Sequence, residues 1–253
     1  MMDNKQVYST VEFESWADKE QLIEEEKYLI ETYLARTGKI LEAGTAGGRI
    51  LLEMKQMGFT SLAGYDYVPE FIEQAKKRDA TQSISFEVQD ATSLNYEDAS
   101  FDQIIYLQQI ICLIENDSSR LKAMEEAYRI LKMGGIALFS FLSFETRVRS
   151  PIYKSYLSYL SLIRKLRGSN RSLQYIPWLK LGGKPNWLCL LDRGPYPYWY
   201  QVAEAEQIIK KVGFHVVAVG SSYQIKQEGR MPESIETLAN ERLQGMLYFV
   251  CKK

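Results

Sequence analysis

Apolar and polar positions along the chain predict strands and helices in regular alternation. Short apolar runs predict strands over Lys39–Ala43, Leu62–Tyr65, Ile84–Val88, Phe101–Leu107, Ile136–Leu142, Phe214–Val219 and Met246–Cys251. Apolar residues at three- and four-residue spacing predict helices over Arg49–Met57, Pro69–Arg78, about 117–132 and Val202–Val212, and more weakly over Glu233–Arg242. Asp117 or Ser118 is the expected N-cap of the third of these. Strands and helices in this order predict an α/β fold with a Rossmann-like, doubly wound parallel sheet.

The first 37 residues follow another pattern, rich in glutamate. Apolar residues recur there at mixed helical spacing: Leu22, Leu29, Ile30, Tyr33 and Leu34. This spacing predicts one amphipathic helix over Glu12–Thr37, stopped by Gly38. Its acidic run, Glu24 to Glu26, is interpreted as a solvated face.

Residues 144–200 interrupt the alternation. They hold five of the seven prolines and three of the four tryptophans. Apolar residues at helical spacing predict an amphipathic helix with cations near its end: Tyr153, Tyr156, Leu157, Leu160, Ile163 and Leu166, then Arg164, Lys165 and Arg167. We expect an aromatic and basic lid insert after strand five, covering the carboxyl ends of the strands. The single domain then divides into an N-terminal helical region (1–37), a cofactor-binding core (38–143), the insert (144–200) and C-terminal helix and strands (201–253).

Composition narrows the class of protein. The 253 residues have a net charge of −1, but residues 1–37 carry −5 and residues 144–200 carry +8. No apolar stretch approaches the roughly 20 residues of a membrane-spanning helix. Three scattered cysteines exclude a disulfide scaffold and favour a cytoplasmic protein with reduced thiols, and with one histidine they offer no metal site.

The strongest motif is a glycine-rich turn between the first strand and its helix. It runs from Glu42 to Gly48, and Asp66 follows at the end of the next strand, where a carboxylate can accept bonds from ribose hydroxyls. A dinucleotide fingerprint would place its third glycine at the position of Arg49. The acid Glu42 also suits an ammonium group better than a pyrophosphate. The turn therefore favours a nucleoside ligand that carries an amine.

On these residues the chain resembles the class I S-adenosylmethionine-dependent methyltransferases, specifically those of type 11. The first motif of that family, acid-x-G-x-G-x-G, matches Glu42–Gly48 with Ala46 as its one departure. The second-strand motif matches Gly64–Ala75, with Val68 in place of serine. Three further matches follow in order at Gln89–Ala91 with Leu94, at Ser100–Ile105 and at Arg129–Gly135, and five motifs in order at proper spacing are a strong signal. The resemblance covers residues 38–143 and resumes over 201–252.

The resemblance implies a seven-stranded sheet whose last strand, Met246–Cys251, runs antiparallel between the fifth and sixth. It also implies S-adenosylmethionine as cofactor and S-adenosylhomocysteine as product. The resemblance also implies which residues bind each part of the cofactor. Glu42, Gly44 and Ala46 would face the methionine part and Asp66 would hold the ribose; Tyr67, Asp90 and Ala91 would contact the adenine, and Leu107 and Gln108 would lie nearest the sulfonium. Asp66 as a helix cap and Asp90 as a turn residue are the structural alternatives.

The acceptor is the open question. We expect methyl transfer to O, N or C of a small molecule, anionic or aromatic, chosen by the insert. The alternatives are an RNA or protein acceptor bound by the basic insert, contact of that insert with an anionic membrane surface, and a non-catalytic binding module on the same scaffold. No catalytic residue is identified: His215 is interpreted as a polar strand residue and Asp102 as structural. The aromatic run Tyr196–Tyr200 fits a pocket wall or the core equally.

Overall fold

The predicted strands form one seven-stranded sheet in the computed structural model, which describes residues 4–253. The strands are β1 (Lys39–Ala43), β2 (Ser61–Asp66), β3 (Ser85–Val88), β4 (Phe101–Tyr106), β5 (Leu131–Phe141), β8 (His215–Ser221) and β9 (Leu247–Lys252). Their order is β3-β2-β1-β4-β5-β9-β8, and β9 runs antiparallel to both neighbours while β1 to β5 pair in parallel. The predicted fold class and the place of the last strand are confirmed.

Helices connect and flank these strands. Those of the first 140 residues are α1 (Asn4–Ser9), α2 (Phe13–Ala17), α3 (Glu24–Tyr33), α4 (Arg49–Gln56), α5 (Pro69–Arg78), α6 (Ile110–Leu113) and α7 (Asp117–Ile130). The rest of the chain adds α8 (Phe144–Arg149), α9 (Pro151–Leu166), the 3-10 helix η1 (Trp187–Leu191), α10 (Val202–Val212), the π-helix η2 (Gln224–Glu228) and α11 (Ile235–Ala239), with a small hairpin of β6 (Lys180–Leu181) and β7 (Lys184–Pro185).

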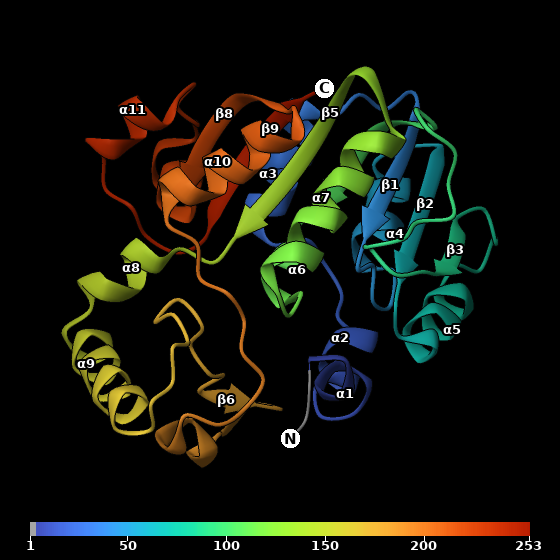
Figure 1. Ribbon diagram of the computed structural model, residues 1–253. Helices are drawn as coiled ribbons and strands as arrows, with labels where there is room; N and C mark the ends of the chain where they lie inside the picture. The colour runs from blue at the N-terminus through green and yellow to red at the C-terminus, as the bar shows by residue number, and fades with distance from the viewer. Residues whose placement is uncertain (1–3) are drawn as a thin grey trace.

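Alternate residues of each strand enter two hydrophobic cores, one on each face of the sheet. In β4, Ile104 packs with residues of α7 and α10, and its neighbour Ile105 packs with residues of α3 and α4. In β5, Phe139 belongs to the same core as Ile104, and Leu138 belongs to the same core as Ile105. Figure 1 shows α7 and α10 in front of the sheet and α3 and α4 behind it. The parallel strands are covered on both faces, which explains their nearly continuous apolar sequence.

The N-terminal region differs from the sequence prediction. The single helix expected over Glu12–Thr37 is wrong: α2 ends at Ala17, Gln21 takes a left-handed φ of 58°, and α3 begins only at Glu24. The helix stop predicted at Gly38 is also wrong, because α3 ends at Tyr33 and Leu34 is already extended. The gap lets α1 and α2 leave the sheet and reach the carboxyl ends of the strands.

The acidic run in α3 is not a solvated face. Only Glu24 is exposed, whereas Glu25 and Glu26 are buried. Glu25 pairs with Lys226 of η2 at 3.1 Å, and Glu26 makes a two-bond ion pair with Arg49 at the start of α4. These acids hold α3 against other segments.

The predicted N-cap of α7 is also wrong. Neither Asp117 nor Ser118 caps α7; the N-cap is Asn116, whose side chain accepts a hydrogen bond from the Ser119 amide.

The insert (residues 144–200) has its own buried ion pair. Arg164 of α9, one of the cations predicted near the end of that helix, is 3% exposed and forms two bonds to Asp192, at 2.8 and 2.7 Å. It also donates to the carbonyls of Ser172 and Tyr175. Of the aromatic run Tyr196–Tyr200, the last three residues are buried, and Tyr200 packs edge-on against Phe141 of β5. One arginine thus ties three stretches of the insert together.

We therefore expect Asp192→Asn to destabilise the insert. Removing one partner of a buried ion pair leaves an uncompensated charge and costs about 3–5 kcal/mol. Urea denaturation followed by tryptophan fluorescence, together with limited trypsin digestion, measures the effect, and Arg193→Gln at the exposed neighbouring position is the control. Equal protease resistance of the two variants would contradict this assignment.

Candidate functional site

The glycine turn after β1 is shaped by backbone conformation and by close packing. Gly44 and Gly48 take left-handed φ values of 62° and 79°, and Ala46 takes 46° despite its side chain. Gly47 has another reason: a Cβ there would lie 1.9 Å from the carbonyl oxygen of Ala17. The glycine at 47 therefore lets the end of α2 rest on the turn.

Asp66 ends β2 and faces this turn. Its carboxylate accepts the amide N–H groups of Ala46 and Val68, each at 3.0 Å. Val68 is the N-cap residue of α5, so the carboxylate braces the start of that helix as well as the glycine turn. Burial raises the pKa of Asp66 to about 6, against the lowering effect of the backbone N–H donors.

Glu42 is the last acid before the turn. It is 4% exposed, and Thr45 Oγ1 donates a hydrogen bond of 2.7 Å to it. Burial raises the pKa of Glu42 to about 8, even though Arg49 nearby favours the ionised form. A cation entering beside Glu42 would restore its charge.

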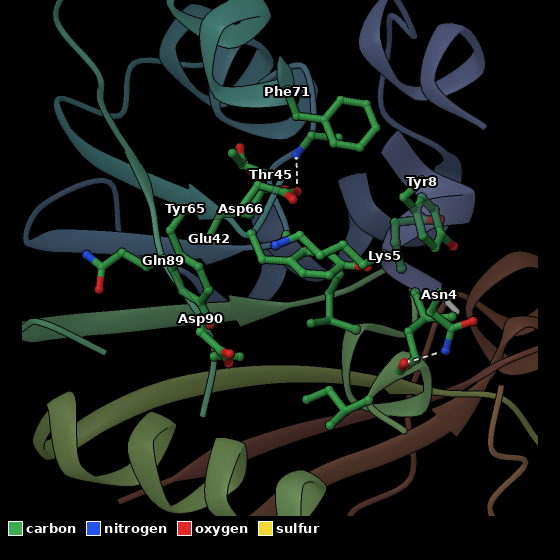
Figure 2. A pocket seen from close by; sticks show the side chains of 18 of the residues that line it. Asn4, Lys5, Tyr8, Glu42, Thr45, Tyr65, Asp66, Phe71, Gln89 and Asp90 are labelled. Atoms are coloured by element: carbon green, nitrogen blue, oxygen red, sulfur yellow. Dashed lines mark hydrogen bonds between the residues drawn. The ribbon is translucent and has the colours of Figure 1, made fainter. Parts of the chain in front are cut away.

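All nine residues predicted to bind a cofactor line one cavity, the first cavity, of about 380 Å³ at the carboxyl ends of β1, β2 and β4. They are Glu42, Gly44, Ala46, Asp66, Tyr67, Asp90, Ala91, Leu107 and Gln108. Figure 2 shows Glu42 and Asp66 near its middle and Gln89 and Asp90 toward one end. The volume is within the usual range for small-molecule sites.

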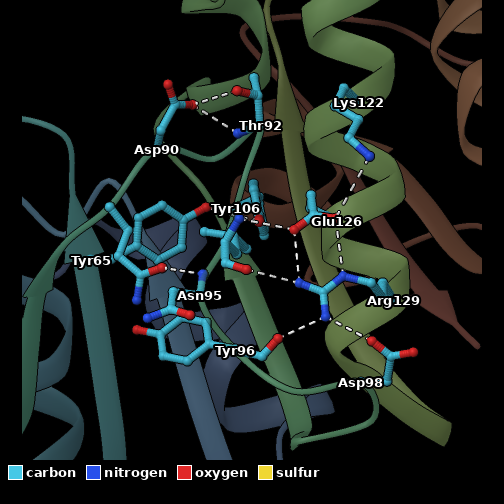
Figure 3. Close-up of polar contacts among 12 residues, drawn as sticks. Tyr65, Asp90, Thr92, Asn95, Tyr96, Asp98, Tyr106, Lys122, Glu126 and Arg129 are labelled. Atoms are coloured by element: carbon cyan, nitrogen blue, oxygen red, sulfur yellow. Dashed lines mark hydrogen bonds and ion pairs between the residues drawn. The ribbon is translucent and has the colours of Figure 1, made fainter.

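The loop after β3 carries Asp90 and is fastened to α7. Asp90 is exposed and accepts from the amide and hydroxyl of Thr92, both at 2.8 Å, so the turn role weighed for it is present. Glu126 accepts the amide of Leu94, and Arg129 donates to the carbonyls of Leu94 and Tyr96 (Figure 3). These bonds explain why the loop keeps Asp90 and Ala91 at the rim of the first cavity.

Sequence reasoning missed the opposite wall of this cavity. Four residues of α1 and α2 line it: Asn4, Lys5, Tyr8 and Trp16. Phe13 stacks on Phe71 of α5 with ring centres 5.0 Å apart, and the Asn4 side chain donates to the Leu113 carbonyl. Figure 2 shows Asn4, Lys5 and Tyr8 across the cavity from Gln89 and Asp90. The aromatic residues of this acidic segment were the available signal.

The turn after β4 is strained and held from three sides. Gln108 and Gln109 both take left-handed φ values, 56° and 64°, which are uncommon for side-chain-bearing residues. Gln108 Nε2 donates to Glu26, the Gln109 amide donates to Ser140 Oγ, and Gln109 Nε2 approaches Met246 Sδ at 3.4 Å. Backbone strain of this kind gathers at functional sites.

A second cavity of about 600 Å³ is linked to this turn through Met246. Met246, the partner of Gln109, lines it together with residues of α8, α9 and the loops before β9: Leu142, Ser143, Thr146, Arg147, Arg149, Ser150, Tyr153, Trp199, Arg242, Leu243, Gln244 and Gly245. The insert contributes to this cavity, whereas all described residues that line the first cavity come from outside 144–200.

Arg147 dominates the charge of the second cavity. Its guanidinium lies between two rings, 4.3 Å from the centre of Tyr153 and 4.1 Å from that of Trp199. Within residues 4–253, no carboxylate forms an ion pair with Arg147, Arg149 or Arg242. The buried indole N–H of Trp199 also has no acceptor in the described chain. The cavity therefore offers positive charge for an anionic group.

A sheet of this order with carboxylates flanking a glycine turn defines a class I methyltransferase fold. The methyltransferase domain family model matches residues 41–139. A solved S-adenosylmethionine-dependent methyltransferase from Methanosarcina mazei aligns with a TM-score of 0.64 at 18% identity, over 89% of this chain and 96% of that one. The [4+2]-cyclase SpnF aligns with a TM-score of 0.61 at 14% identity, over 100% and 97%.

A curated relative is similar in sequence. The chain is 30% identical over 150 residues to the ubiquinone/menaquinone biosynthesis C-methyltransferase UbiE of Geobacter sp. strain M21, which is 55% of this chain and 61% of the relative. The chain thus spans less than two thirds of that relative. Residues 41–139 are a class I methyltransferase domain, whose class uses S-adenosylmethionine as cofactor.

The protonation of Glu42 makes a specific prediction for cofactor binding. Near pH 7 a carboxyl with a pKa of about 8 is mostly protonated, and an ammonium beside it lowers that pKa. S-adenosylmethionine should therefore release up to about one proton per site on binding. Calorimetry at pH 7 in buffers of different ionisation enthalpy measures this number. Glu42→Gln should abolish the release, and a buffer-independent heat for the unmodified protein would refute the assignment.

The wall formed by α1 and α2 predicts a role for Trp16. Trp16→Ala should weaken S-adenosylhomocysteine binding about fivefold, mainly through faster dissociation, because about 1 kcal/mol of contact is lost. Stopped-flow fluorescence measures the rates. Trp187→Ala is the matched control, since Trp187 is exposed and does not line the first cavity. Equal effects of both changes would argue against a covering role for α2.

Proposed function

We propose that this protein transfers the methyl group of S-adenosylmethionine to a small-molecule acceptor seated in the second cavity. The observation that carries the proposal is a pair of cavities, one lined by the predicted cofactor residues, including Gln108, and the other by arginines without an ion-pair partner and by Met246, which contacts Gln109. The domain match and the UbiE relative, named as a biosynthetic C-methyltransferase, support it.

The residues of the first cavity fit this cofactor chemically. Glu42 offers a buried carboxyl to the amino group of the methionine part, beside the open backbone at Gly44 and Ala46. Asp66 has two backbone donors, which leaves further lone pairs for ribose hydroxyls. In this proposal Tyr67, Asp90 and Ala91 contact the adenine, and Leu107 and Gln108 lie nearest the sulfonium.

The chain's part in the chemistry is alignment and exclusion of water. When bound, S-adenosylmethionine supplies an electrophilic methyl group on a sulfonium. The fixed turn at Gln108 and Gln109 orients the acceptor beside it, and α1 and α2 shield the first cavity from solvent. Histidine is not among the described residues that line either cavity, and His215 is exposed on β8. An acceptor atom that is already nucleophilic suits such a site.

We propose an acceptor that carries a carboxylate or phosphate on an aromatic or apolar body. Arg147, stacked between two rings, can present its guanidinium edge to an anion, and Trp199 can donate to the same group. Burial lowers the pKa of Arg147 because it destabilises the charged guanidinium. An anion that pairs with Arg147 would stabilise that charge again. In this proposal the insert (144–200) acts as the substrate lid after strand five, and residues 1–37, 38–143 and 201–253 complete the domain as divided above.

The place of action is part of the proposal. All three cysteines are buried free thiols, which favours a cytoplasmic protein with reduced cysteines. No helix within residues 4–253 is long and apolar enough to cross a membrane.

The decisive experiment measures binding and turnover on the same preparation. Calorimetry should detect S-adenosylmethionine, and Asp66→Asn should weaken it at least about tenfold, the loss of roughly one charged hydrogen bond. Mass spectrometry should then detect S-adenosylhomocysteine formation with aromatic carboxylates or phenyl phosphates, and much less with their neutral amides. Arg147→Gln should raise the acceptor KM while cofactor affinity stays unchanged.

Turnover must be measured because the fold alone does not decide the reaction, as the cyclase neighbour illustrates. Well-folded protein that binds neither S-adenosylmethionine nor its product would overturn the proposal. Binding without transfer to any acceptor would favour the non-catalytic module. Salt-sensitive RNA binding through the insert, with methylation of that RNA, would favour the nucleic-acid alternative.

A further inference from the structure

The outer face of the insert exposes an unusual concentration of large apolar side chains. Eight of the thirteen large hydrophobic residues exposed within the described chain belong to α9 and η1. They form what we call the apolar flank: Ile152, Tyr159, Leu162 and Leu166 of α9, and Trp187, Leu188, Leu190 and Leu191 of η1. Leu166 and Trp187 are 74% and 73% exposed.

The flank is one continuous surface. Tyr159, Leu162 and Leu166 follow at three- and four-residue spacing and share one side of α9, while Leu157, Leu160 and Arg164 are buried on another. Tyr159 Oη donates to the Leu190 carbonyl at 2.6 Å, and Arg167 donates to the Leu191 carbonyl. These bonds join the exposed side of α9 to η1. Figure 1 shows α9 at the edge of the molecule, away from the sheet.

Positive charge surrounds the flank. Apart from Arg149, which lines the second cavity, the insert exposes seven cations that form no ion pair with a described residue: Lys154, Lys165, Arg167, Arg171, Lys180, Lys184 and Arg193. Of its two acids, Asp192 is paired with the buried Arg164, and Glu145 accepts the Val202 amide at the far end of the insert from η1. The exposed cations of the insert therefore outnumber its unpaired carboxylate.

We infer that the apolar flank docks this protein on an anionic lipid bilayer. Exposed tryptophan and leucine enter the boundary between headgroups and acyl chains, and Lys and Arg beside them attract anionic headgroups. A second copy of the chain fits less well, because a two-fold contact through this face would oppose the same block of cations. Docking of this kind is peripheral and requires no spanning helix.

Vesicle binding tests the inference independently of methyl transfer. The full chain is mixed with vesicles of phosphatidylcholine alone or with 30% phosphatidylglycerol, and the bound fraction is measured by flotation. We expect binding to the anionic vesicles only, with a blue shift of tryptophan emission that Trp187→Phe removes. Leu162→Gln with Leu166→Gln, and separately Lys154→Gln with Lys165→Gln, should each lower the partition coefficient about tenfold.

Matched controls separate the flank from general surface effects. Met133→Gln removes an equally exposed apolar residue elsewhere, and Lys76→Gln with Lys77→Gln removes two exposed cations of α5; both should leave binding unchanged. Each variant should keep its S-adenosylhomocysteine affinity, since the first cavity contains no insert residue. Absence of vesicle binding, equal effects of flank and control variants, or concentration-dependent dimerisation that the flank variants abolish would overturn the inference.

Discussion

The buried ion pair between Glu26 and Arg49 is the constraint on which the site depends. Taking both charges out of water costs several kcal/mol per ion, and only close bonding offsets that cost. Glu26 meets this condition: it bonds both terminal nitrogens of Arg49, the Ile23 amide and the side chain of Gln108. Glu26 therefore holds together the N-terminal helix α3, the helix after the glycine turn and the strained turn after β4.

In this arrangement the N-terminal segment lines one cavity and the insert contributes to the other. With α3 fixed, α1 and α2 extend across the strand ends, and Gly47 lets Ala17 settle on the glycine turn. Arg78 bonds the carbonyls of both residues and fastens the contact. Because the N-terminal segment closes the first cavity, the insert is free to form the second. The two cavities are thus lined by segments about 130 residues apart in sequence, α1 and α2 at the first and the insert at the second.

Local patterns predicted the strands and the glycine turn, because both depend on residues that are close in sequence. The family resemblance built on those motifs implied the place of the last strand and nine of the residues that line the first cavity. The failures were charges and breaks set by distant contacts. Glu26 was predicted to face solvent, yet it is buried against Arg49, 23 residues away, and Arg164 is buried against Asp192, 28 residues away, which the helical spacing did not indicate. The break after Ala17 arises from packing on Gly47, which no helical spacing of the N-terminal segment reveals.

The contrast between local patterns and distant contacts also applies to the basic insert. Its composition alone was compatible with an anionic small molecule, RNA, protein or a membrane surface as partner. Its cations divide by their surroundings: Arg164 is neutralised inside, Arg147 is stacked between rings in a cavity, and the remaining exposed cations surround an apolar flank. A cation used for folding has a carboxylate partner, whereas a cation that folding leaves unpaired beside a cavity or an apolar surface remains available to a ligand. The charge of +8 therefore describes three environments, and only two of them face outside partners.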